Sequence, residues 1–306
     1  MHHAAAAPYN NNTIIKTQQH HHHHQLMNKS GDNMESPHIS WTEFQPGAWA
    51  VDNLLTPEDC QCLLERAREE GIETKKMECD TRHRQRVTVR LSVPEISEIL
   101  WERIRDQIPQ ELVITGDEEI DPPGLLAPQD CIGRWTPSRV HSNMNVAYCT
   151  GKGHLAAHRD GDSILSENER SFLTINGYLT DRPVGTGGAT RFLKDDIVVS
   201  GADIHVSEET DVLYRIESDK AGKAVVFLHG LMHDGESLAP DSPPKWVFRS
   251  LVYYTRDPSS APQLTPEQQE ARACLNQAEQ YEMNGDISNA IKSYNKAYRL
   301  DPSLES

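Results

Sequence analysis

Apolar and β-branched residues recur in short runs along the middle of the chain. The clearest runs are residues 146–149, 170–178, 224–228 and 245–254, and glycine or proline lies between them. Short runs rich in Val, Ile, Thr and aromatic residues and bounded by turn residues are typical of β-strands. Several such strands at this spacing favour an antiparallel barrel or jelly roll. Gly187 and Gly188 predict a turn, followed by a return strand.

A helical region precedes these strands. Thr56 followed by Pro57 has the pattern of an N-cap and a first helical residue, and Gly71 marks an end. Apolar residues then recur at helical spacing, and a second stripe follows from Pro94. We expect both helices to pack on the outside of the barrel and to carry no catalytic residue. The stripes are Cys60, Leu63, Leu64 and Ala67, and Ile96, Leu100 and Ile104.

Residues 261–306 change character and predict a C-terminal α-hairpin. Small and aromatic residues alternate as in a tetratricopeptide repeat, with a turn at Gly285-Asp286. A single repeat cannot bury both of its faces, so it either docks on the main domain, begins a longer array or pairs between chains. The simpler alternative is a helical hairpin that braces the main domain. The other is a surface that binds a partner protein. The pattern residues are Ala271, Ala278, Tyr281, Ala290, Ile291, Tyr294, Ala297, Asp301 and Pro302.

Residues 1–38 form a polar leader rich in Ala, Asn, Gln and His, including His20 to His24. It lacks the apolar core of a signal peptide, and we expect it to be disordered. No window approaches 18 apolar residues, so we expect no membrane span. These features predict a cytoplasmic or nuclear protein with its six cysteines reduced.

Charge and cysteine spacing exclude other classes. The net charge is −16, from 46 acidic and 30 basic residues, and no basic stretch compensates, so nucleic-acid binding is disfavoured. The cysteines form no pair of Cys-x-x-Cys motifs, which disfavours a structural zinc site. Asp160-Gly-Asp162 begins like a calcium loop, but Ile164 and Leu165 stand where an oxygen ligand and a glycine are required.

His158-Arg-Asp160 and the distant His233 form the candidate metal site. Two imidazoles and one carboxylate are the facial ligand set of non-heme Fe(II) oxygenases, with three positions left open. Residues i and i+2 of a strand point to one side, which suits the His-x-Asp pair. His229 competes with His233 as the third ligand. The His-Asp-Gly sequence that begins at His233 favours His233.

The order of motifs resembles the prolyl 4-hydroxylase-type 2-oxoglutarate/Fe(II) dioxygenases over roughly residues 45 to 256. The motifs are Tyr-x-x-Gly, His-x-Asp-Gly, Ser-x-x-Thr-x-x-x-Tyr-Leu, Gly-Gly-x-Thr-x-Phe, His-x-Gly and a later Arg. The resemblance implies a mainly β fold, a double-stranded β-helix with helices outside, in an oxygenase domain at residues 39–260. It implies Fe(II) bound by His158, Asp160 and His233.

The same resemblance implies cosubstrate contacts. Arg249 matches the basic residue that pairs with the distal carboxylate of 2-oxoglutarate, and Tyr148 and Tyr178 match tyrosines that hydrogen-bond the cosubstrate. Oxygen is the other cosubstrate, and a requirement for ascorbate is left open. The interval from His233 to Arg249 is longer than usual for the family, which predicts an enlarged turn there.

These features predict a dioxygenase that hydroxylates a C–H bond, with a prolyl residue of a protein or peptide as the leading substrate. The alternatives are an oxygenase acting on a free amino acid or other small molecule, and a noncatalytic, repeat-bearing interaction protein. The fold by itself does not decide between these substrates.

Overall fold

The computed structural model of the chain describes residues 38–76, 84–117, 119–126, 128–195, 208–283 and 286–305. All of the predicted leader except residue 38 lies outside the described residues, as does Gly285 of the predicted hairpin turn.

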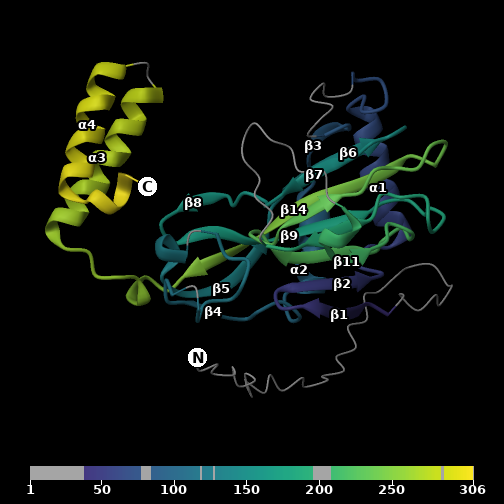
Figure 1. Cartoon of the computed structure of the whole chain (residues 1–306), viewed down its shortest axis with the longest axis horizontal. Helices are drawn as coiled ribbons and strands as arrows, with labels where there is room; N and C mark the ends of the chain where they lie inside the picture. Colours follow the sequence, from purple (N-terminus) through teal and green to yellow (C-terminus); the bar gives the residue numbers. More distant parts are fainter. Residues whose placement is uncertain are drawn as a thin grey trace, which may run out of the picture. The chain divides into compact units, whose positions relative to one another are not determined.

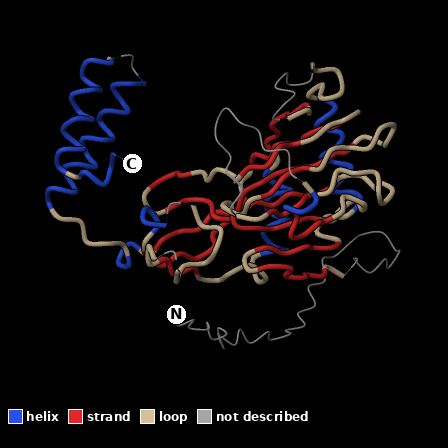
Figure 2. Tube along the Cα trace, in the orientation of Figure 1, coloured by secondary structure: helices blue, strands red, loops and turns tan. Residues whose placement is uncertain are grey.

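Strands dominate the described part of the chain, and they form two antiparallel sheets (Figures 1 and 2). The large sheet runs β1-β2-β12-β9-β14-β5-β4, with β6 joining β14 to β3 and β8 pairing with β9. Its strands are β1 (Ser40–Gln45), β2 (Ala48–Asp52), β3 (Val87–Ser92), β4 (Leu112–Ile114), β5 (Gly133–Val140), β6 (Asn143–Cys149), β8 (Ile164–Ser166), β9 (Glu169–Tyr178), β12 (Ala224–Leu228) and β14 (Lys245–Arg256).

The small sheet runs β11-β10-β13-β7. Its strands are β7 (Leu155–His158), β10 (Thr190–Leu193), β11 (Val212–Ile216) and β13 (His233–Gly235). Short 3-10 turns connect some elements, at Pro128–Cys131, Glu209–Asp211, Pro258–Ser260 and Pro302–Glu305.

The chain passes back and forth between the sheets. From β6 it crosses to β7, returns at β9, crosses to β10 and β11, returns at β12, crosses to β13 and returns at β14. The central strands of the large sheet therefore run β12-β9-β14-β6, and they face β11-β10-β13-β7. This winding is a double-stranded β-helix, or jelly roll, and it confirms the predicted fold class.

The strands predicted from apolar runs are present as β6, β9, β12 and β14, and the predicted return strand is β10. The glycine turn before β10 is also present, because Gly187 and Gly188 have φ angles of +69° and +82°, which favour residues without a side chain. The space between the sheets contains fully buried side chains, including Phe192 and Phe227, whose ring centroids lie 5.2 Å apart.

Two helices lie in the N-terminal part as predicted, α1 (Pro57–Glu69) and α2 (Pro94–Ile104). The Thr56 hydroxyl accepts from the Asp59 N–H, and the Asp59 carboxylate accepts from the Thr56 N–H. These two reciprocal hydrogen bonds form a capping box at the N-terminus of α1. Helix α1 contacts β3 and α2 contacts β5. Both predicted stripes are buried, and Arg103 of α2 joins the helices through an ion pair with Asp59 at 2.6 Å.

The C-terminal hairpin consists of α3 (Pro266–Met283) and α4 (Ile287–Leu300), which pack on each other. Small buried residues allow the helices to approach, among them Ala271, Ala278, Ala290 and Ala297. A helix pair is therefore present as expected, whereas its assignment to a tetratricopeptide repeat stays a prediction. None of the helices in the described residues combines the length and apolar composition needed to span a bilayer.

Candidate metal and cosubstrate site

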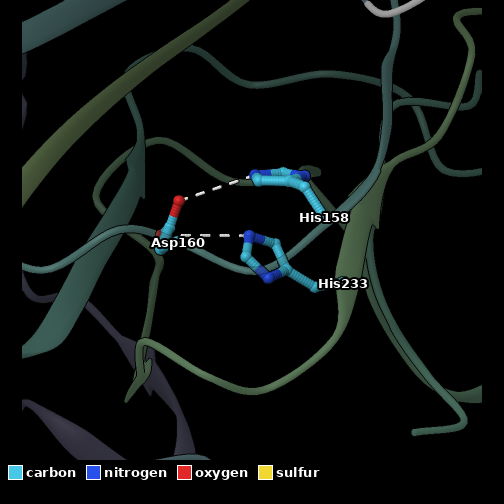
Figure 3. Close-up of side chains that lie close together, drawn as sticks. All are labelled: His158, Asp160 and His233. Carbon is cyan, nitrogen blue, oxygen red and sulfur yellow. Dashed lines mark ion pairs between the residues drawn. The ribbon is translucent and has the colours of Figure 1, made fainter. Parts of the chain in front are cut away.

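The three predicted metal ligands come together between the sheets (Figure 3). His158 ends β7 and His233 begins β13, and these residues are directly paired across the two strands. Asp160 follows His158 by two residues and points toward both imidazoles. One ligand atom from each residue lies within 4.8 Å of the others. The Nε2 atoms of His158 and His233 are 3.5 and 3.9 Å from the Asp160 carboxylate oxygens.

Both imidazoles are oriented for metal binding by their own backbone. His158 Nδ1 lies 2.8 Å from the Ala156 carbonyl, and His233 Nδ1 lies 2.9 Å from the Leu231 carbonyl. A carbonyl only accepts, so each Nδ1 carries the proton and each Nε2 lone pair faces Asp160. Such carbonyl contacts fix the tautomer of metal-bound histidines. The donor set therefore fits a divalent cation such as Fe(II).

The charge states of the triad also suit a metal. Burial lowers the pKa of His233 to about 4, so this imidazole is neutral near pH 7. Burial alone would raise the pKa of Asp160, but its contact with His158 and the neighbouring His233 and Arg249 hold that pKa below its usual range. Neutral imidazoles and an ionised carboxylate are the forms in which these residues bind metal.

His229, the competing ligand, belongs to a hydrogen-bond network behind the metal ligands. It is buried, and the group of potential metal ligands does not include it. Its Nδ1 lies 3.0 Å from Thr174 Oγ1, which is 2.7 Å from Asp160 Oδ2, and its Nε2 lies 2.9 Å from Ser171 Oγ. The ionised carboxylate can only accept, so Thr174 donates to it and accepts from His229 Nδ1–H. His229 therefore supports Asp160 from behind.

A cavity of about 270 Å³ opens over the triad. Its walls come from the inner faces of β6, β9 and β14 on one side and from β7, β10 and β13 on the other. Two cations of β14 line it, Lys245 and Arg249, which lie four residues apart on one face of the strand.

Arg249 reaches the metal ligands themselves. Its Nη2 lies 3.1 Å from Asp160 Oδ1, whereas its Nε is buried without a hydrogen-bond partner. This proximity agrees with a role in the site, and it places the guanidinium against one of the metal ligands. The prediction that Arg249 holds the distal carboxylate of 2-oxoglutarate stays a prediction.

Lys245 is a second basic residue of β14 in the cavity wall. Its side chain is 8% exposed, and among the described residues its ammonium makes neither a hydrogen bond nor an ion pair. The ammonium lies 5.3 Å from the centre of the Tyr178 ring. Burial lowers the pKa of Lys245 to about 8, which still leaves it protonated near pH 7. A buried cation without an anion is unfavourable, so this position fits a carboxylate ligand.

Other basic residues near the site have partners. Arg191 of β10 forms a bidentate pair with Asp234, at 2.9 and 2.6 Å. Arg182 donates to the carbonyls of Pro243 and Gly187 and so ties down the segment between β13 and β14. That segment spans residues 236–244, where the sequence predicts an enlarged turn.

The two predicted tyrosines do not line the cavity. Tyr148 lies on the opposite face of β6 from Cys149, which does line it, and its ring packs 4.6 Å from that of Trp246. Tyr178 is fully buried, and its hydroxyl lies 2.8 Å from Thr190 Oγ1. These placements give no support to direct contacts with a cosubstrate. Strand alternation is the physical reason for Tyr148, because neighbouring residues face opposite sides.

No family model matches the chain, and a search of curated proteins finds no match. Among solved structures, it is similar to a viral collagen prolyl hydroxylase of Paramecium bursaria Chlorella virus-1 in complex with 2-oxoglutarate, at 17% identity over 67% of this chain and 95% of that one, with a TM-score of 0.39.

Two further solved structures are similar at the same level. A Pseudomonas putida prolyl-4-hydroxylase is 15% identical, with coverages of 69% and 92% and a TM-score of 0.39. The epimerase SnoN, in complex with Fe3+, alpha-ketoglutarate and nogalamycin RO, is 13% identical, with coverages of 71% and 83% and a TM-score of 0.40. At such low values, the strand order and the triad of this chain carry the assignment of fold and site.

Proposed function

We propose that this protein is an Fe(II)- and 2-oxoglutarate-dependent dioxygenase that hydroxylates a C–H bond. The observation that supports it most is the triad of His158, Asp160 and His233, which presents two imidazole nitrogens and a carboxylate to one cavity. Its intact ligand set disfavours a noncatalytic interaction protein.

The residues of the chain have separate tasks in this reaction. The triad would hold the metal beside the cavity that would take the cosubstrate and the substrate. When bound, iron with 2-oxoglutarate and oxygen supplies the oxidising chemistry, which yields succinate, carbon dioxide and a hydroxylated product. The protein contributes orientation, since the carbonyls of Ala156 and Leu231 fix both imidazoles and Thr174 fixes Asp160.

For the distal carboxylate of 2-oxoglutarate, Lys245 fits better than Arg249. Lys245 is buried in the cavity wall without an anion, whereas Arg249 already contacts the metal ligand Asp160. A dicarboxylate with one end on the metal needs a cation removed from the metal for its other end. Lys245 lies four residues further along β14 on the same face and meets this requirement.

Titration of 2-oxoglutarate against two variants tests this assignment. Lys245→Met keeps the length of the side chain and removes the charge, and it should raise the half-saturating concentration at least about tenfold, because hydrogen bonds to charged groups contribute roughly 1.5–3 kcal/mol. Arg249→Gln should change it by less than about threefold. The opposite ranking would return the role to Arg249, as the sequence resemblance implies.

A prolyl residue in a protein or peptide is the leading substrate, and the order of sequence motifs is its support. A free amino acid or other small molecule is the alternative, and the cationic wall of the cavity favours an acidic one. Incubation with proline-containing peptides and with free amino acids, followed by mass spectrometry for the gain of one oxygen atom, tests the two. A gain on free amino acids alone would contradict the peptide assignment.

A further inference from the structure

We propose that Asn145, Arg249 and Asn176 form a subsite that binds a carboxylate of the substrate to be oxidised, beside the metal triad. The inference rests on the proposed function and goes beyond it by assigning a charge to the substrate. It concerns the inner face of the large sheet, at the level where β14 passes the metal ligands.

The three side chains form a row across adjacent strands. Arg249 of β14 is directly paired with Asn145 of β6 on one side and with Asn176 of β9 on the other. Directly opposed residues of neighbouring strands project from the same face, and all three line the cavity. The row lies next to the metal ligands, because Arg249 Nη2 is 3.1 Å from Asp160 Oδ1.

The polar groups of this row have capacity for a ligand. Neither carboxamide makes a side-chain hydrogen bond within the described residues, and Arg249 Nε is buried without a partner. A guanidinium presents a planar fork that matches a carboxylate, and carboxamides can donate to the same oxygens or accept from an adjoining amide. The row therefore suits a carboxylate that lies close to a peptide-like amide.

The charges around the cavity leave Arg249 without an anion once the site is filled. Three acids line the cavity, and two of them have basic partners elsewhere: Asp234 pairs with Arg191, and Glu236 pairs with Arg215. Asp160 is the third acid, and a divalent metal bound by the triad would neutralise its charge. The two carboxylates of 2-oxoglutarate are matched by the metal and Lys245, so the charge of Arg249 is left over.

The surroundings reinforce this excess. The protein as a whole carries a net charge of −16, yet among the described residues the arginines and lysines that line this cavity outnumber its three acids. A concave site in which one sign of charge predominates concentrates ligands of the opposite sign. The substrate class implied is an acidic residue of a peptide or a free amino acid, both of which present the same carboxylate chemistry.

Calorimetric binding to the full-length protein, loaded with Fe(II) and 2-oxoglutarate without oxygen, tests the subsite. The peptide source is represented by N-acetylaspartic acid α-amide against its neutral counterpart, N-acetylasparagine α-amide. The free amino acid source is represented by proline against prolinamide. We expect at least one carboxylate probe to bind at least about tenfold more tightly than its amide, and the stronger pair identifies the source.

Variants separate this subsite from the cosubstrate site. Arg249→Gln should remove the preference for the carboxylate and leave the affinity for 2-oxoglutarate within about threefold, whereas Arg249→Lys should retain part of the preference because it keeps the charge. Arg139→Gln, which removes a surface arginine paired with Glu169 at 2.7 Å, is the matched control and should change neither affinity.

Three results would overturn the inference. These are equal binding of acid and amide by the wild-type protein, an undiminished preference in Arg249→Gln, or loss of 2-oxoglutarate affinity in that variant. Failure of the wild-type protein to bind 2-oxoglutarate at all would instead contradict the proposed function.

Discussion

Removal of one hydroxyl, in Thr174→Val, should weaken both the fold and the metal site. Thr174 Oγ1 donates to Asp160 Oδ2 at 2.7 Å and accepts from His229 Nδ1 at 3.0 Å, and all three residues are buried. Valine keeps the shape of threonine but can make neither hydrogen bond. The imidazole N–H of His229 would then be buried without an acceptor, while its Nε2 still accepts from Ser171.

The magnitude follows from these two contacts. A hydrogen bond to a charged group contributes about 1.5–3 kcal/mol, and an unsatisfied buried donor costs about 1–3 kcal/mol. The free energy of unfolding should therefore fall by roughly 2.5–6 kcal/mol. Metal affinity should fall by about 10–100-fold, the range typical of residues that orient a metal ligand.

Two matched variants isolate the role of the hydroxyl. Thr174→Ser retains both hydrogen bonds and loses one methyl group, worth about 0.8 kcal/mol. Thr180→Val makes the same exchange at a buried hydroxyl that has no hydrogen-bond partner, so it should be close to neutral.

Urea unfolding of the metal-free proteins and Fe(II) titration without oxygen measure the two effects. If Thr174→Val matched Thr180→Val in both measurements, the support that we assign to Thr174 would be refuted.

Three further predictions concern the third metal ligand, the pH dependence of stability and the C-terminal hairpin. His233→Ala should abolish metal binding while His229→Gln only weakens it, as metal titration would show; the reverse ranking would make His229 the ligand. Burial lowers the pKa of His229 to about 4 from about 6.5, so on acidification the unfolded chain takes up a proton before the folded protein does. The free energy of unfolding should therefore decrease as the pH is lowered from about 6.5 to about 4, and it should decrease less steeply in His229→Gln. Truncation after Pro262 should leave 2-oxoglutarate turnover measurable and lower either thermal stability or substrate recruitment; complete loss of turnover in a folded truncate would place part of the site in the hairpin.

The metal ligands could be predicted from the sequence because their chemistry is local. His158 and Asp160 are two residues apart on extended chain, which places both on one side whatever the rest of the fold does. His233 required only a second strand alongside, and the motif around it was sufficient to prefer it to His229. The apolar runs likewise predicted the central strands, since burial from both sides leaves a plain signal.

Residues whose role depends on strand register or on distant partners were not predictable in this way. Tyr148 and Cys149 are neighbours, and only the register of β6 decides which one faces the cavity. Thr174 and His229 are 55 residues apart, and no periodicity connects them.

The basic residues of β14 show the same limit. Lys245 and Arg249 lie on one face of β14, and both line the cavity. The number of residues between His233 and each of them does not show which one binds the distal carboxylate of 2-oxoglutarate.

Conversion of 2-oxoglutarate to succinate tests the central claim most directly. The Fe(II)-loaded protein should form succinate only when oxygen is present. Asp160→Ala should form none while it still unfolds cooperatively in urea, because the buried core holds the domain together even when the hydrogen bond from Thr174 is lost. Turnover that survives in Asp160→Ala, or a wild-type protein that binds iron yet leaves 2-oxoglutarate unchanged in oxygen, would contradict the account.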